Sequence, residues 1–553
     1  MTKILFFLGM MTIPFSGVVG LGFLGELQNN LSTYFFIAAI VSGAQFFATS
    51  SGVLRAQGQE IPSTKLLAGI MLAVTSVIAV SFFVNAGSIL TNVSHGRHAI
   101  EKFVSSFVLI LYSFMLAYLT FFIAGHGWER AIRKPIAISA LLCVAFSVFE
   151  ILSPLGIATG VYAFLDGIVH GGLTPPGYAK GWDPRLRSLA FEPPDFGNYA
   201  GFAWPWLMAG WVSSHGRARC GYAVVWVFLT ALALYSSPRT WLVLMTGSAF
   251  VLAALRYGYL PPKPYKKGKS KSRVLTVFLT CLVLAAVLFC AANLQQYETD
   301  VIAGSSVSDL SRLASIEAAF NMFRDKPVFG LGLGQYGFYF DKYLPRWGHS
   351  SYEIANWLAH KPEQGWPACY LVYARLAAEL GLAGLVMWIG LWIWLARSVL
   401  IASLNYQRAT GLVPTAAYPL IASCFCVLFS GFTTDTFRTP MIWVTLGLCC
   451  RYLFEIRKYV QQQHDLRHLK LNRLAIPKIP QRTSPAPGPR PRRVPVPSPA
   501  KLLLQRSRNG VWRAKIAEAV AIIANALHSN ANSCILSASG KELILARLIP
   551  CKR

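Results

Sequence analysis

Apolar residues along the chain fall into long, nearly uninterrupted runs separated by shorter polar stretches. A helical run of about 18 to 25 apolar residues crosses the hydrocarbon core of a bilayer, which is about 30 Å thick. The pattern predicts an all-α, polytopic membrane helix bundle of about twelve transmembrane helices. The runs lie near residues 4–24, 32–49, 66–85, 103–124, 135–156, 198–214, 220–236, 240–256, 273–291, 376–397, 413–431 and 439–455.

The loops between these runs alternate in charge, and the alternation predicts their sidedness. One set carries most of the Lys and Arg, for example Arg130, Arg133 and Lys134, or the stretch 256–273, which contains no acidic residue. Such loops face the cytoplasm by the positive-inside rule. Both termini are then expected to be cytoplasmic. The long loop 292–368 falls on the opposite, extracytoplasmic side.

Composition agrees with a membrane protein, since 13% of the residues are charged and 54% are hydrophobic, against about 25% charged in soluble domains. Much of the net charge of +28 lies in a basic tail. The predicted organisation is therefore a transmembrane domain over residues 1–455 and a basic, largely disordered cytoplasmic tail over 456–553. We expect the tail to face anionic lipid, with no nucleic acid as partner. The cysteines lie mostly in apolar runs and predict no metal site.

The long extracytoplasmic loop has a helical start and a glycine-rich middle. Apolar residues recur at helical spacing from Ser308, and Pro327 is expected to end that helix. Glycines then cluster between Gly330 and Gly337. They follow no predicted strand, so they predict a tight turn rather than a nucleotide-binding loop. Aromatic residues follow from Tyr336 onward and can either anchor the loop at the membrane interface or stack on sugar rings.

Three further stretches stand out: SRLASIEAAFNMFRDKPVFGLGLGQYGFYF (311–340), LVYARLAAELGLAGLVMW (371–388) and SSPRTWLVLM (236–245). Together they resemble the O-antigen ligase/polymerase superfamily of bacterial membrane glycan transferases, which implies a location in the bacterial inner membrane. A weaker match is RLRSLAFEPPDFGNYAGF (185–202). The resemblance covers roughly residues 185–450 and agrees in order, sidedness and number of spans.

The resemblance implies a reaction. A glycan linked by pyrophosphate to a polyprenyl lipid is moved to an acceptor sugar hydroxyl, with no nucleotide, cofactor or metal ion. The partners implied are the polyprenyl-pyrophosphate-linked oligosaccharide, an acceptor glycan and the lipid bilayer. A flippase and a chain-length regulator protein are further candidate partners. The acceptor is another lipid-linked repeat unit in a polymerase and lipid A-core in a ligase.

Arginines suit this reaction because the diphosphate leaving group gains negative charge, and a guanidinium binds two phosphate oxygens at once. By the resemblance Arg239 is the first candidate, Arg312 the second, and Arg187 or Arg185 the third. A base must accept the proton of the acceptor hydroxyl. One candidate is His360, and Glu192 and Asp195 are alternative bases or binders of the acceptor hydroxyl. Further substrate contacts are expected as a set: Tyr336, Gly332, Gly334 and Arg375.

Two more local expectations follow from spacing. Arg375 and Glu379 lie four apart on one helix face and are expected to pair. Glu150, an acidic residue within an apolar run, is expected to hold polar groups near the outer end of that helix.

One departure from the family pattern bears on the type of reaction. Ligases place a His directly before the segment that begins at Leu371, whereas this chain has Cys369 and Tyr370 there. The departure favours a polymerase over a ligase. A small-solute transporter and a non-catalytic scaffold for polysaccharide export stay as alternatives, although no internal repeat of the transporter kind is visible.

Overall fold

The computed structural model describes residues 1–18, 20–21, 27–56, 64–94, 96–124, 128–170, 185–236, 244, 247–248, 307–359, 366–411 and 414–475. Residues Met1–Arg473 form one compact unit. The basic tail beyond residue 475 lies outside the described residues, as do nearly all of the predicted spans at 240–256 and 273–291.

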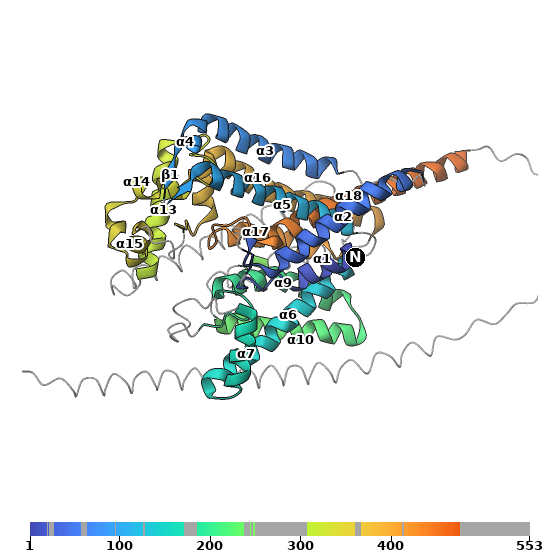
Figure 1. The fold of residues 1–553 in the computed structure, drawn as a ribbon. Coiled ribbons are helices and arrows are strands. Elements are labelled where there is room, and N and C mark those ends of the chain that lie inside the picture. The colour runs from blue at the N-terminus through green and yellow to red at the C-terminus, as the bar shows by residue number, and fades with distance from the viewer. Residues whose placement is uncertain are drawn as a thin grey trace, which may run out of the picture. The chain divides into compact units, whose positions relative to one another are not determined.

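The described chain is almost entirely helical (Figure 1). A single hairpin of two-residue strands pairs β1 (Val93–Ser94) with β2 (Arg97–His98) in antiparallel register, Val93 opposite His98. The α-helices are α1 (Thr2–Met11), α2 (Leu31–Ala56), α3 (Lys65–Val84), α4 (Ala86–Thr91), α5 (Ala99–Ile123), α6 (Trp128–Leu152), α7 (Thr159–His170), α9 (Pro193–Ser213), α10 (Gly216–Ser236), α13 (Val307–Asp325), α14 (Tyr336–Tyr343), α15 (Tyr352–Leu358), α16 (Val372–Thr410), α17 (Ala417–Ser430) and α18 (Pro440–Ala475). Two 3₁₀ turns, η2 (Ser153–Leu155) and η3 (Arg346–Ser350), follow α6 and α14.

The prediction of an all-α membrane bundle is confirmed. In the described residues, five helical segments are long and apolar enough to cross a bilayer, and they contain α3, α5, α6, α10 and α16. Shorter apolar helices lie at Thr2–Met11, Leu31–Ala44 and Ala417–Ser430. The first span differs from the prediction, because α1 ends at Met11 instead of continuing to residue 24. Pro14 lacks an N–H and disfavours helix in the residue before it.

Two hydrophobic cores account for the packing. The larger core is built from α1, α5, α6, α9 and α16–α18, with buried anchors such as Trp206, Trp392 and Phe425. The smaller core joins α13, α14 and α15 to the start of α16, around Met322, Phe340 and Trp357. In Figure 1 the helices α13, α14 and α15 gather at one end of α3, α5 and α16. This end is called the loop end below.

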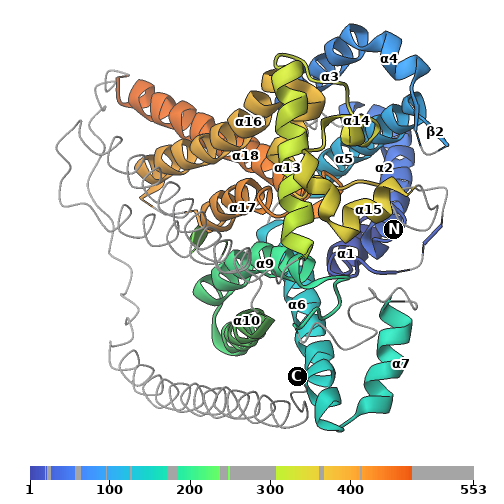
Figure 2. The ribbon, with the colours of Figure 1, turned by 90° about the vertical axis from the view of Figure 1, so that its left-hand side faces the viewer.

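Helix α13 agrees with its prediction, since it runs from Val307 to Asp325 and Pro327 follows it. Its buried side chains recur at helical spacing: Ala314, Ala318, Ala319 and Met322. These small residues let α13 lie closely on its neighbours. It packs against α14, α15 and α16, and Figure 2 shows it lying across the loop end.

Helix α16 is interrupted at Gly381, whose backbone angles (φ 65°, ψ −159°) are not helical. A break frees carbonyls before it and N–H groups after it, and buried groups of this kind need other partners. The glycine loop, defined here as residues 327–334, supplies partners in both directions. It donates from Leu331 N to Ala378 O and from Gly332 N to Glu379 O (both 2.9 Å), and it accepts from Leu382 N at Pro327 O (2.8 Å) and from Ala383 N at Val328 O (3.2 Å).

The two backbones approach so closely that glycine is required on both sides. A Cβ at Gly330, which has a φ of 63°, would lie 2.4 Å from the carbonyl carbon of Glu379, and one at Gly381 would lie 2.4 Å from that of Val328. The prediction of a tight glycine turn is confirmed. Its partner is the broken helix, and its N–H groups at Leu331 and Gly332 bond to the chain itself.

Candidate active site

The glycine loop is also fastened by side chains from two helices. Ser81 Oγ of α3 donates to Phe329 O (2.7 Å), and Nδ2 of Asn85, the residue between α3 and α4, donates to Gly330 O (3.0 Å). On α16, the buried Glu379 accepts from Gly334 N at 2.9 Å. Arg375 Nε donates to the other oxygen of Glu379 at 3.2 Å, which confirms the predicted pair.

The Arg375 guanidinium links this loop to the segment between α17 and α18, because its Nη1 donates to Asp435 O at 2.7 Å. Gly332 and Gly334 are buried in the loop, and Tyr336 is buried with its hydroxyl donating to Ser315 O at 2.9 Å. All four residues singled out as substrate contacts therefore have structural partners. Their direct contact with a substrate stays a prediction.

Polar residues from the starts of five helices, together with Arg185 from the segment before α9, lie at the loop end and are called the end cluster. Its members are Arg185, Glu192, Asp195, Arg312, Glu353, Tyr370 and Arg438. Glu192 caps α9, Asp195 lies in the first turn of α9, and Glu353 lies in the first turn of α15. Arg312 lies near the start of α13, Tyr370 just before α16 and Arg438 just before α18.

The pKa of Glu192 is affected by the charges of other members of the end cluster. The Glu192 carboxylate is exposed, but enough protein surrounds it that burial raises its pKa. The negative charge of Asp195 raises the pKa of Glu192 further, whereas Arg312 and Arg185 lower it. Burial raises the pKa of Asp195, and the positive charge of Arg438 lowers it. The cluster thus combines a carboxylate that holds protons more readily than an ordinary glutamate with several guanidinium groups.

Direct contacts join α13, α15 and the start of α16 within the cluster. The Tyr370 hydroxyl donates to Glu353 Oε1 at 2.6 Å, and Ser311 Oγ donates to Glu353 Oε2. The Arg312 guanidinium carbon lies 5.4 Å from the centroid of the Tyr370 ring, within the range of a cation–π interaction. Burial, followed by the hydrogen bond to Glu353, raises the pKa of Tyr370 well above its usual value.

The end cluster is suited to binding an anion. Arg185 and Arg312 are exposed, and the helix starts add partial positive charge from their free N–H groups. Within the described residues, no side chain hydrogen-bonds to the Glu192 oxygens, so this carboxylate can accept a proton from a bound hydroxyl. Nothing in the described part of the chain brings three His, Cys, Asp or Glu side chains together as a metal-binding group.

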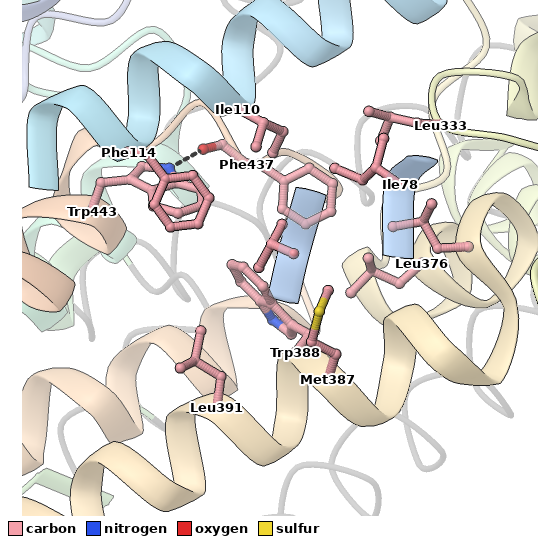
Figure 3. A pocket seen from close by; sticks show the side chains of 12 residues that line it. Ile78, Ile110, Phe114, Leu333, Leu376, Met387, Trp388, Leu391, Phe437 and Trp443 are labelled. Atoms are coloured by element: carbon pink, nitrogen blue, oxygen red, sulfur yellow. Dashed lines mark hydrogen bonds between the residues drawn. The ribbon is translucent and has the colours of Figure 1, made fainter. Parts of the chain in front are cut away.

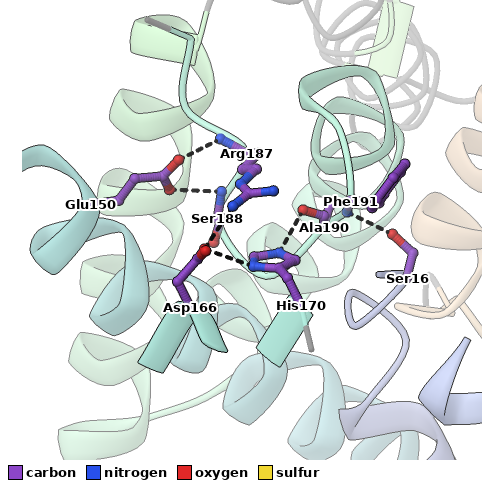
Figure 4. Close-up of polar contacts among 8 residues, drawn as sticks. All are labelled: Ser16, Glu150, Asp166, His170, Arg187, Ser188, Ala190 and Phe191. Atoms are coloured by element: carbon purple, nitrogen blue, oxygen red, sulfur yellow. Dashed lines mark hydrogen bonds and ion pairs between the residues drawn. The ribbon is translucent and has the colours of Figure 1, made fainter. Parts of the chain in front are cut away.

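Arg187 lies apart from Arg185, in a buried network between α6 and α7 (Figure 4). Its Nη2 donates to Asp166 Oδ1 at 2.7 Å, and only 2% of the residue is exposed. Asp166 Oδ1 also lies 2.8 Å from His170 Nδ1, while His170 Nε2 lies 3.0 Å from Ala190 O. Burial alone would raise the pKa of Asp166, but the His170 hydrogen bond and the Arg187 charge lower it.

Glu150 fixes the segment that carries both arginines. Its two oxygens accept from Arg187 N (3.0 Å) and Ser188 N (2.8 Å), as expected for an acidic residue that holds polar groups near the end of α6. Ser188 has a φ of 54° and its hydroxyl donates to Cys143 O at 3.0 Å. The network therefore sets the shape of residues 185–192, which deliver Arg185 and Glu192 to the end cluster.

Two predicted residues, Arg239 and His360, lie outside the described residues. Of the remaining catalytic and phosphate-binding candidates, the structure brings Arg312, Arg185 and Glu192 together and places Arg187 elsewhere. Sequence reasoning did not single out Glu353, Asp166 or Arg438. The only sequence feature that drew attention to Tyr370 was its place where ligases of the family carry a His.

An apolar cavity lies between α3, α5, α16 and the start of α18 (Figure 3). Leu333 of the glycine loop lines it together with Ile78, Phe114, Trp388 and Trp443. Its volume is about 30 Å³, which is the share of one water molecule in liquid water. It offers no charged group for a diphosphate, so the end cluster is the better candidate site.

Comparison with known families finds a match over part of the chain. Residues 223–389 match the family described as O-antigen ligase, whereas no curated protein matches the chain. The matched stretch contains Arg312, the glycine loop and the break at Gly381, but residues 185–192 lie before it. The match confirms the resemblance over residues 223–389, a stretch similar to membrane glycan transferases of the O-antigen ligase/polymerase superfamily.

Proposed function

We propose that the protein transfers a glycan from a polyprenyl pyrophosphate to an acceptor sugar hydroxyl at the outer face of the inner membrane, as a polymerase of O-antigen or exopolysaccharide. The observation that carries the proposal is the end cluster, in which the positive charges of Arg312 and Arg185 lower the pKa of the neighbouring Glu192 carboxyl. The transfer needs a binding site for a diphosphate and an acceptor for one proton. The cluster contains both.

The arginines act on the leaving group. As the bond from the anomeric carbon to the phosphate oxygen breaks, its electron pair passes to the diphosphate and negative charge grows there. Arg312 and Arg185 lie where fixed positive charge can stabilise that charge, and such an effect contributes several kcal/mol at a favourable site. Both arginines are exposed residues, so a lipid headgroup that approaches from the membrane surface can reach them.

Glu192 acts on the acceptor. The acceptor oxygen forms the new bond to the anomeric carbon, and its proton passes to the carboxylate. A base works best when its pKa is close to the working pH. Burial and the neighbouring Asp195 raise the pKa of Glu192, which moves it in that direction. His360 stays a second candidate for the same step, and Arg239 a further phosphate ligand.

Two acceptors are compatible with the family match. The family description names a ligase, which would use lipid A-core, whereas Cys369 and Tyr370 stand where ligases carry a His. The latter observation favours polymerisation onto another lipid-linked repeat unit. Purified protein supplied with a lipid-pyrophosphate oligosaccharide, with and without lipid A-core, distinguishes them. Ladder formation without lipid A-core supports the polymerase, and product formed only when lipid A-core is present supports the ligase.

The test of the chemistry compares two arginines on α13. We expect Arg312→Ala to lose transfer activity while the protein still inserts in the membrane. Arg324→Ala is the matched control, because Arg324 is exposed in the last turn of the same helix and hydrogen-bonds only locally to Asn321 among the contacts that the structure shows. Equal activity of the two variants would contradict the proposal.

A further inference from the structure

Tyr370 has a strained backbone. Its φ is 61°, in the left-handed region that side chains other than glycine rarely adopt. Such strain persists only where the surroundings determine the conformation, and it gathers at functional sites. The residue at this position is a tyrosine and not a glycine, so the surrounding structure must hold the strained backbone.

The backbone on both sides of Tyr370 is held by the segment between α17 and α18. Cys369 N donates to Asp435 Oδ2 at 2.9 Å. Val372 N donates to Gly431 O at 3.0 Å and to Thr434 O at 2.8 Å. Hydrogen bonds therefore fix the backbone on both sides of Tyr370, and this restricts the orientation of its side chain.

The Tyr370 side chain extends toward Arg312. The ring lies against the Arg312 guanidinium at 5.4 Å and stacks on Trp357 of α15, with centroids 6.3 Å apart and planes 29° apart. The hydroxyl bonds to Glu353, whose other oxygen accepts from Ser311, the neighbour of Arg312. One tyrosine therefore connects α13 and α15 to the anchored start of α16.

We propose that Tyr370 is a positioning residue that fixes the Arg312 guanidinium for the departing diphosphate, with Glu353 as the anchor of its hydroxyl. The proposal rests on the proposed function of Arg312. A long arginine side chain on an exposed helix face samples many rotamers. The ring of Tyr370 limits them from one side, and a misplacement of about 1 Å can cost up to about 100-fold in rate.

The test uses the full-length protein in nanodiscs with a lipid-pyrophosphate oligosaccharide as substrate. Tyr370→Leu removes the ring, and we expect kcat to fall between about 10- and 100-fold with KM changed less. Tyr370→Phe keeps the ring over Arg312 and loses the hydrogen bond, so it should recover most of the lost kcat. Activity is expressed per folded protein, measured by monodisperse elution and thermal unfolding. A purely structural role would lower the folded fraction and leave kcat unchanged.

A double-mutant cycle tests whether Tyr370 acts through Arg312. In an Arg312→Lys background, Tyr370→Leu should lower kcat by less than threefold, because the guanidinium it positions is gone. A full additional loss there would overturn the inference. So would equal kcat losses in the Phe and Leu variants. If Arg312→Ala is inactive while Tyr370→Leu keeps normal kcat, only this inference fails; if Arg312→Ala is active, the proposed function fails as well.

Discussion

The N–H of Leu331 donates to the carbonyl of Ala378 at 2.9 Å, which in a continuous helix would accept from Leu382. The N–H of Leu382 instead donates to Pro327 O at 2.8 Å. The glycine loop has thus taken the place of one helical turn of α16. Through this exchange, α13 and the rest of the loop end are joined by backbone hydrogen bonds to a membrane-spanning helix.

The first prediction concerns this joint. Gly381→Ala places a side chain at positive φ and 2.4 Å from Val328 C, so we expect a loss of at least about 1 to 3 kcal/mol in the free energy of unfolding. Gly390→Ala is the matched control on the same helix, because nothing lies within 4 Å of its Cβ. Ala is the better helix former there by about 1 kcal/mol. In detergent, the midpoint of thermal unfolding should fall for Gly381→Ala and rise for Gly390→Ala. An unchanged midpoint for Gly381→Ala would contradict the close contact between the glycine loop and α16.

The second prediction separates two arginines that lie two residues apart. Arg187→Ala removes a buried guanidinium and leaves the partly buried Asp166 carboxylate with His170 as its partner. Removing one partner of a fully buried ion pair costs about 3 to 5 kcal/mol, which is an upper bound here, so the folded yield should fall. Arg185→Ala removes an exposed cation from the end cluster, so activity should fall while yield stays normal. Size-exclusion chromatography and transfer assays on the same preparations measure both. A normal yield with lost activity for Arg187→Ala, and a lost yield for Arg185→Ala, would contradict this assignment.

The third prediction is a pH dependence. Activity requires the Glu192 carboxylate and is lost as pH falls through its pKa. Because burial and Asp195 raise that pKa, the acid limb should lie at higher pH than for an ordinary glutamate. Asp195→Asn removes the repulsion, which lowers the pKa, so the acid limb should move to lower pH. Ser16→Ala controls for loss of the Ser16–Asp195 hydrogen bond. An acid limb that Asp195→Asn does not move would argue against Glu192 as the base.

The fourth prediction concerns sidedness. Trp347 is 41% exposed at the loop end, and Arg217 is exposed at the start of α10. In a chain whose native cysteines have been replaced, Trp347→Cys should react with an impermeant maleimide in intact spheroplasts. Arg217→Cys should react only after permeabilisation. Labelling in the opposite order would place the end cluster in the cytoplasm, where the proposed reaction could not use its substrate.

Some of this architecture could be read from local sequence and some could not. The extent of α13 followed from apolar spacing and Pro327, because both act within a few residues. The partner of the glycine loop could not be predicted, since it depends on a break in α16 about fifty residues away. Arg185 and Arg187 look alike in sequence. Only Asp166 and Glu150, brought together by the packing of α6 and α7, decide which of the two is buried.

The most direct test of the central claim measures glycan transfer by purified Arg312→Ala and Arg185→Ala proteins, each reconstituted with a lipid-pyrophosphate oligosaccharide and compared with Arg324→Ala. The account predicts that kcat/KM falls by at least about 100-fold in Arg312→Ala, the size of effect seen when one group that stabilises developing charge is removed. It predicts a smaller loss in Arg185→Ala and none in Arg324→Ala. Unchanged transfer by both Arg312→Ala and Arg185→Ala would contradict the assignment of the end cluster as the diphosphate site.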